Sequence, residues 1–160
     1  MSRTGTMAVA LGILFLIATA LAVTMLLTDT NLRTNFGTLS SGYYLHWYAV
    51  LAMAAVSVLG AGLLIGLRSR ATILGSAIGS GLLALAMVAD IATYAEVGFS
   101  SASSFAQYLF GITYYGGDIR YLFDVLLATY LVTFGLSLAA LAWTRASRPS
   151  QDSGPAAPAP

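Results

Sequence analysis

Cysteine is absent from this 160-residue sequence, and charged side chains are scarce. Without cysteine the chain cannot form disulfides, thiolate metal sites or iron–sulfur centres, and it has no cysteine nucleophile. Charged residues make up 8% of the chain, against about a quarter in ordinary globular proteins. The net charge of +1 provides no basic field for nucleic acid, so we do not expect nucleic-acid binding.

The familiar catalytic and cofactor-binding motifs are missing as well. The sequence contains no Walker loop, no HExxH or GxSxG motif and no dinucleotide-binding fingerprint. His46 is the only histidine, which excludes a haem held by two histidines of one chain. We therefore expect no cofactor, and the sequence favours a non-enzymatic role over catalysis.

Apolar residues, in contrast, are abundant and are arranged in long runs. They make up 58% of the chain, and each of four runs exceeds the roughly 20 residues that a helix needs to cross a bilayer. The sequence predicts an all-α integral membrane protein whose residues 1–145 form an antiparallel bundle of four transmembrane helices. The helices are expected at about residues 7–27, 43–67, 71–94 and 121–143.

The first apolar run has a competing interpretation. Arg3 precedes it, and Ala18-Thr19-Ala20 resembles the cleavage site of a secretory signal peptide. However, the apolar stretch continues past these residues to Leu27, which makes it longer than the core of a signal peptide. We therefore expect a helix that is retained in the protein.

The arginines predict the orientation in the membrane. Five of the seven lie before the first run, in the turn between the second and third runs, or after the fourth run. Because arginine is enriched in cytoplasmic loops, both termini and this turn are expected in the cytoplasm, with the protein in the plasma membrane. The five are Arg3, Arg68, Arg70, Arg145 and Arg148, and the other two are Arg33 and Arg120.

Three further segments connect or follow the apolar runs. Residues 28–42 are rich in Thr, Asn and Gly and are expected to form a solvated connection. Residues 95–120 carry apolar side chains at helical spacing, which predicts a short helix that lies flat on the outer membrane surface or packs across the mouth of the bundle. This helix is expected to act as a lid, a partner-docking surface or a gate. Residues 146–160, with four prolines among Ala, Ser and Gly, are expected to form a disordered tail.

Glycines at four-residue spacing predict where two helices pack. Lipid provides no hydrophobic force between helices, so close backbone approach through small residues is the main signal of packing. The tight turn makes the second and third helices antiparallel, which would bring Gly66 near Gly75 and Gly62 near Gly79. We expect these strips to pack within the chain, and an oligomer interface is the alternative.

The fourth apolar run carries a weakly polar stripe formed by Thr129, Thr133 and Ser137. Hydroxyl side chains inside an apolar helix can donate hydrogen bonds to backbone carbonyls one turn earlier. We therefore expect a packing seam in which these hydroxyls are bonded to the backbone.

Ionisable residues gather at the predicted outer ends of the helices. His46 and Asp90 are expected at similar depth in the second and third helices, Asp124 lies near the start of the fourth, and Glu96 lies in the adjoining loop. Ionisable groups in a membrane span suggest a functional site. Three interpretations are open: a structural tie between helices at the interface, a proton or cation site, and a divalent metal site of nitrogen and oxygen ligands.

Three functions follow from these features. The first is a non-catalytic accessory subunit that binds other membrane proteins, with energy-transducing assemblies as one candidate class, or that binds copies of itself. The second is a small oligomeric channel or carrier with Asp90, and with it His46, at its outer mouth. The third is a metal-binding membrane enzyme that uses His46, Asp90, Glu96 and Asp124.

Overall fold

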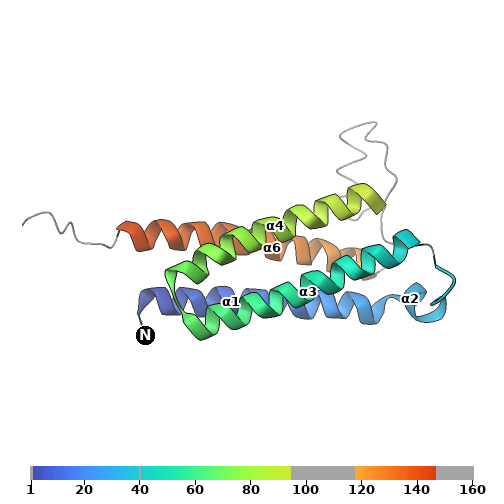
Figure 1. Cartoon of the computed structure of the whole chain (residues 1–160), viewed down its shortest axis with the longest axis horizontal. Helices are drawn as coiled ribbons and strands as arrows, with labels where there is room; N and C mark the ends of the chain where they lie inside the picture. Colours follow the sequence, from blue (N-terminus) through green and yellow to red (C-terminus); the bar gives the residue numbers. More distant parts are fainter. Residues whose placement is uncertain (1, 40, 95–117, 147–160) are drawn as a thin grey trace, which may run out of the picture.

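The computed structural model describes residues 2–39, 41–94 and 118–146 (Figure 1). Within these ranges every regular element is a helix, and four helices are long and apolar enough to cross a membrane. This confirms the all-helical, multi-pass character predicted from the apolar runs. The elements are α1 (Arg3–Thr28), the short α2 (Thr30–Thr34), α3 (Ser41–Leu67), α4 (Arg70–Tyr94) and α6 (Asp118–Ala146).

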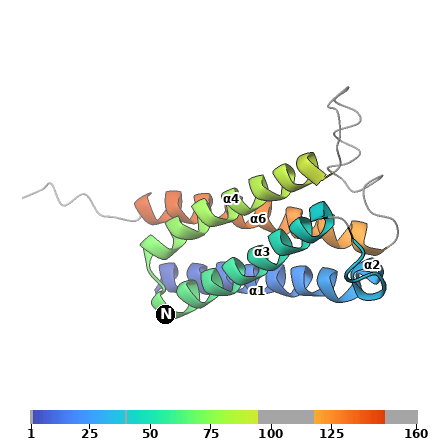
Figure 2. The same ribbon diagram turned by 45° about the vertical axis from the view of Figure 1, so that its right-hand side comes forward.

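The four long helices lie side by side as two pairs (Figures 1 and 2). Helix α3 packs mainly against α1, α4 packs mainly against α6, and an extensive contact between α1 and α6 joins the pairs. The contact between α3 and α4 is much smaller. The "turn end" of the bundle holds Arg3, the connection between α3 and α4 and the last turn of α6, and the opposite "α2 end" holds α2 (Figure 1).

The close packing of α1 on α3 depends on glycine. A Cβ atom added at Gly12 would lie 2.7 Å from Cγ1 of Ile65, and one at Gly60 would lie 3.6 Å from the ring of Phe15. At Gly12 only a residue without a side chain leaves room for the facing helix. Small residues therefore bring these two backbones together, as expected for helices in lipid.

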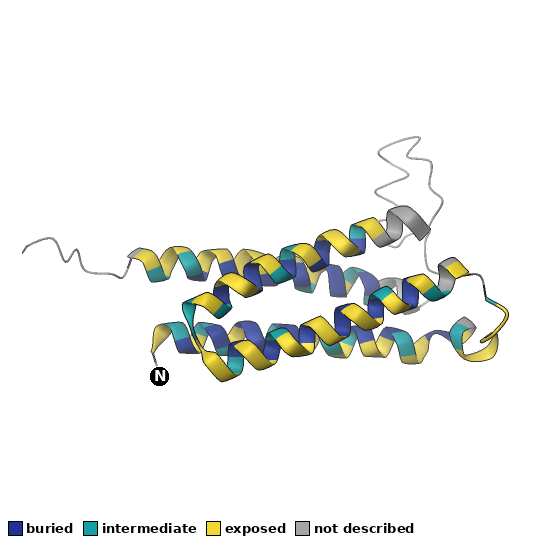
Figure 3. Ribbon diagram, in the orientation of Figure 1, coloured by how far each residue is buried: buried dark blue, intermediate teal, exposed yellow. Residues whose placement is uncertain are grey.

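Along their described length, the four long helices each bury one face and expose the other (Figure 3). The largest fully buried side chains on α6 are Tyr130 and Phe123, and Met25 of α1 and Ile73 of α4 are also buried. On the outside, many large apolar side chains are more than half exposed, which is the pattern expected when lipid covers them. Those exposed by 60% or more on the spanning helices include Leu27, Leu45, Leu59, Leu67, Leu82 and Leu85.

The connection between α3 and α4 consists of Arg68 and Ser69. Arg68 adopts a left-handed backbone conformation with φ of 48°, and its Nε donates to the Ile65 carbonyl at 2.8 Å. The Ser69 hydroxyl then accepts from the Thr72 backbone N–H at 3.2 Å and caps the start of α4. A left-handed residue followed by a hydroxyl cap ends one helix and begins the next within two residues.

The connection between α1 and α3 is more ordered than the predicted solvated loop. It begins with the buried Asp29 and the helix α2. Further along, the Gly37 N–H donates to the Tyr44 hydroxyl at 2.6 Å, and the Phe36 and Tyr44 rings meet edge-on at 5.6 Å. The polar composition of residues 28–42 predicted the exposure of residues 33–38 but not the burial of Asp29.

Two predictions lie outside the described residues. The short surface helix was predicted in residues 95–120, of which 95–117 are not described, and the tail was predicted in residues 146–160, of which 147–160 are not described. Both remain predictions from the sequence.

Candidate functional site

His46 lies inside the bundle, near the α2 end. Its side chain is 1% exposed, and its ring meets the adjacent indole of Trp47 edge-on with 4.9 Å between the ring centroids. The adjacent indole is buried as well. A titratable ring at this depth is more enclosed than a histidine at the membrane interface.

Asp29 is a second buried ionisable residue at the α2 end, and it is not among the site residues predicted from the sequence. Its side chain is 1% exposed, and one carboxylate oxygen accepts from the Leu32 N–H at 2.9 Å, which caps α2. Its own N–H donates to the Met25 carbonyl at 3.1 Å and closes the end of α1. A sequence signal was present, because an aspartate directly after an apolar run is a typical N-cap.

The register of α1 and α3 brings these two residues to the same level. Phe15 packs on Gly60, and the two helices are antiparallel. Asp29 follows Phe15 along the chain by the same number of positions by which His46 precedes Gly60. One acidic and one imidazole side chain are therefore enclosed at one depth of the bundle.

Asp124 is half-buried on α6, where the register of α4 and α6 brings Asp90 to nearly the same level. The Ser76 and Ser137 hydroxyls meet across these antiparallel helices at 2.6 Å. Asp90 follows Ser76, and Asp124 precedes Ser137, by nearly equal stretches of helix. The side chain of Asp90 and all of Glu96 lie outside the described part of the chain, so the predicted pairing of Asp90 with His46 stays a prediction.

The described ionisable residues do not form a metal site. In residues 2–39, 41–94 and 118–146, no group of three His, Asp or Glu side chains could hold a metal ion. One reason is depth. The hydroxyls of Ser57 and Tyr130 meet across α3 and α6, and His46 precedes Ser57 by a longer stretch of helix than separates Asp124 from Tyr130. Asp124 is thus deeper in the bundle than His46 by roughly 7 Å along a helix axis.

The polar stripe of α6 has the bonds that the sequence predicted. The hydroxyls of Thr129, Thr133 and Ser137 donate to the carbonyls of Val125, Thr129 and Thr133, each at 2.7 Å. Each hydroxyl thus satisfies its donor one turn back along its own helix. The prediction of a seam with backbone-bonded hydroxyls is confirmed.

Two hydrogen bonds between helices lie in the buried interior. The Ser57 and Tyr130 hydroxyls lie 2.8 Å apart and join α3 to α6, while Ser76 and Ser137 join α4 to α6. Neither Ser57 nor Tyr130 was predicted from the sequence to have a functional or packing role. A tyrosine in the middle of an apolar run was the available signal, because a buried phenol requires a hydrogen-bond partner. Helices α3 and α4 are thus each bonded to α6.

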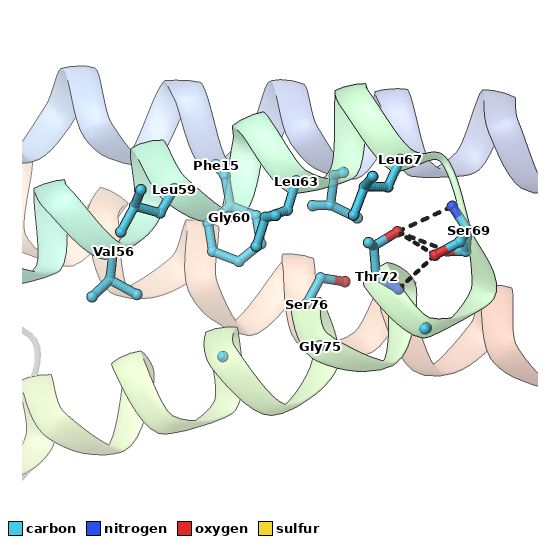
Figure 4. Close-up of a pocket in the computed structure, with 13 residues that line it drawn as sticks. Phe15, Val56, Leu59, Gly60, Leu63, Leu67, Ser69, Thr72, Gly75 and Ser76 are labelled. Carbon is cyan, nitrogen blue, oxygen red and sulfur yellow. Dashed lines mark hydrogen bonds between the residues drawn. The ribbon is translucent and has the colours of Figure 1, made fainter.

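An open groove of about 420 Å³ separates α3 from α4 in the half of the bundle nearest the turn end (Figure 4). One wall is formed by Leu59, Leu63 and Leu67 of α3, spaced one turn apart. The other wall is the strip of α4 that contains Gly75 and Gly79. The lining is almost entirely apolar and is completed by Phe15, Val56, Gly60, Leu64, Ser69, Ala71, Thr72 and Ser76.

The structure does not form the intrachain contact predicted for the two glycine strips. A Cβ atom added at Gly62, Gly66, Gly75 or Gly79 would have no described atom within 4 Å, apart from its two chain neighbours and the nearby backbone of its own helix. Gly75 and Gly79 line the groove, whereas Gly62 and Gly66 are exposed outside it. The reason is that α3 packs on α1 and α4 packs on α6, which draws the two strips apart.

No protein-family model, curated protein or solved structure matches this chain. Its geometry alone therefore defines its class, that of a helical protein with four helices able to span a membrane. Two features of the described residues remain to be explained: the apolar groove between α3 and α4, and the burial of Asp29 and His46 in the interior.

Proposed function

We propose that this protein is a non-catalytic accessory subunit of a larger membrane complex, and that a transmembrane helix of another chain packs in the groove between α3 and α4. The observation that carries this proposal is the unfilled strip of small residues on α4. Ala71, Gly75 and Gly79 recur at four-residue spacing and all line the groove. Such a strip lets a second helix approach closely enough for van der Waals packing, which drives helix association in lipid.

A helix fits this groove better than a lipid chain does. Glycine lowers helix stability and exposes backbone, so a glycine strip is costly where a mobile acyl chain is the only neighbour. Against another helix the same strip removes steric obstruction, and the ridge of Leu59, Leu63 and Leu67 supplies apolar side chains beside it. The glycine strip and the leucine ridge therefore favour a helix over a lipid chain as the occupant of the groove.

We propose further that the turn end faces the cytoplasm and that the protein resides in the plasma membrane. Arg3, Arg68, Arg70 and Arg145 all belong to this end, and no residue described there carries a carboxylate. Clustering of arginine at one end of a helical membrane protein supports this orientation. In it the groove opens into the cytoplasmic half of the bilayer.

A second candidate function, a proton or cation carrier, is supported by the burial of Asp29 and His46 at one level. Burial of ionisable groups in a membrane protein is costly and suggests a transported ion or proton. Flux into liposomes tests this candidate. Asp29→Asn and Asp90→Asn are expected to abolish proton or cation flux, and unchanged flux in both variants would remove it.

The accessory function is tested by purification in a mild detergent. The tagged protein is expected to elute with a second membrane chain in fixed ratio, and an isolated monomer without co-purifying chains would contradict the proposal. Gly75→Leu and Gly79→Leu are expected to release the partner while leaving the helical content of the protein unchanged, because a Cβ atom at either position meets open space.

Gly135→Leu is the matched control for these variants. Gly135 of α6 also has open space around its Cβ position, but it does not line the groove. The control is expected to retain the partner. If Gly135→Leu released the partner as completely as Gly75→Leu, the loss would reflect a general effect of added bulk, and the groove would not be the docking site.

A further inference from the structure

A second hollow lies at the turn end, between α4 and α6. It has a volume of about 350 Å³ and is lined by Arg70, Ala71, Leu74, Leu141 and Arg145. Two guanidinium groups from two different helices therefore border one cavity. Its remaining lining is apolar, and one of these residues, Ala71, also lines the groove between α3 and α4.

Nothing in the described chain neutralises these two arginines. Neither the Arg70 nor the Arg145 side chain makes a hydrogen bond or an ion pair with another described residue. The sequence explains this, because none of the acidic residues in the described ranges belongs to the turn end. Two cations on one cavity with no described carboxylate beside them attract an anion.

The placement of Arg70 strengthens this attraction. Arg70 is the first residue of α4, and the first turn of this helix contains no acidic residue. A helix N-terminus carries partial positive charge, so a cation there is unfavourable until an anion approaches. Arg145 lies in the last turn of α6, where a cation is favoured. A bound anion would thus relieve the unfavourable charge at Arg70 and pair with Arg145.

The apolar floor decides what kind of anion fits. Leu74 and Leu141 extend the hollow from the arginines along the membrane-spanning faces of α4 and α6. A phospholipid can fill both parts, with its phosphate between the guanidiniums and an acyl chain along the leucines. We propose that this hollow binds the headgroup and one chain of an anionic phospholipid, and this proposal does not rest on the docking of a partner helix.

Lipid binding to the detergent-purified protein tests this proposal. Native mass spectrometry compares phosphatidylglycerol with phosphatidylcholine of the same acyl chains. Phosphatidylglycerol is expected to bind more tightly, and Arg70→Gln and Arg145→Gln are each expected to weaken it about fivefold, since each arginine near a lipid surface contributes about 1 kcal/mol. The double variant is expected to lose the preference for phosphatidylglycerol.

Arg68→Gln is the control, because Arg68 lies at the same end but does not line the hollow. It is expected to change the affinity for phosphatidylglycerol by less than twofold. Equal losses of affinity in Arg68→Gln and Arg70→Gln would show that phosphatidylglycerol is attracted by the general positive charge of this end and not bound in the hollow. This result would overturn the proposal. Displacement of phosphatidylglycerol by millimolar inorganic phosphate would also overturn it, since the hollow would then be a site for a soluble anion.

Discussion

The two helices that flank α3, α1 and α4, carry glycines in opposite settings. Toward α1, an added Cβ at Gly12 would lie 2.7 Å from the Ile65 side chain, so the two helices are in tight contact. On the α4 side, a Cβ atom added at Gly75 or Gly79 would have no described atom within 4 Å, apart from its chain neighbours and the nearby backbone of α4 itself. The same type of residue thus marks a contact made within the chain on one side and an open surface on the other.

This difference shows what a pattern of small residues specifies. Small residues specify that a backbone can be approached closely, but they do not specify which helix approaches it. In a soluble protein a glycine strip open to solvent would be accompanied by polar residues. Here the open strip is apolar, so lipid or another helix must cover it. Four predictions test this comparison, from the largest expected effect to the smallest.

Adding a side chain in the close contact between α1 and α3 should destabilise the protein. Gly12→Leu is expected to lower the free energy of unfolding by about 2–3 kcal/mol, because the new side chain must displace Ile65 or separate α1 from α3. Unfolding in mixed detergent micelles, followed by circular dichroism, measures this loss. A variant as stable as the original protein would mean that α1 and α3 do not pack at this distance.

The hydrogen bond between Ser57 and Tyr130 should make a smaller contribution. It ties the groove's α3 wall to α6, and both side chains are fully buried. A double-mutant cycle of Ser57→Ala and Tyr130→Phe is expected to give a coupling energy of about 0.6 kcal/mol, the average for such bonds in membrane proteins. Zero coupling would indicate that this hydrogen bond does not help to hold α3 to α6.

The bond between Ser76 and Ser137 on the α4 side should contribute less still. Both hydroxyls also have a backbone carbonyl within reach, that of Ile73 for Ser76 and that of Thr133 for Ser137. The two hydroxyl groups can donate only two of these three hydrogen bonds at a time. If one serine is removed, the other can therefore still donate to its backbone carbonyl. The coupling energy from Ser76→Ala and Ser137→Ala is expected to be below that of the first pair, and a larger value would contradict this ranking.

Adding a side chain in the groove between α3 and α4 should have the smallest effect on the free energy of unfolding. Gly75→Leu is expected to change the free energy of unfolding of the isolated protein by no more than about 0.5 kcal/mol, because the added side chain enters open space. Comparison with Gly12→Leu in the same micelles provides the measurement. Equal destabilisation by the two variants would show that α3 and α4 close against each other in the bilayer.

The four helices and the α3–α4 turn could be predicted from sequence, because long apolar runs and arginines carry strong signals. The hydroxyl bonds of Thr129 and Ser137 could be predicted because they are local to one helix. The groove could not. Every face of α3 is apolar, so its sequence does not distinguish the face toward α1 from the face toward lipid.

The candidate site at the α2 end was predicted only in part. His46 and Asp124 were identified because an ionisable residue in an apolar run is conspicuous. Asp29 was missed because it lies at the boundary of a polar segment, where an acidic residue is ordinary. Its burial depends on tertiary packing, which composition does not encode.

Photo-crosslinking tests the central claim most directly. A benzophenone amino acid replaces Leu63, which lines the groove and is 56% exposed, or Leu138 of α6, which is 46% exposed and lines no described hollow. In native membranes the probe at position 63 is expected to give one discrete adduct with another protein, and the probe at position 138 none. Adducts with lipid alone at position 63, or the same protein adduct from both positions, would contradict the proposed helix-docking groove.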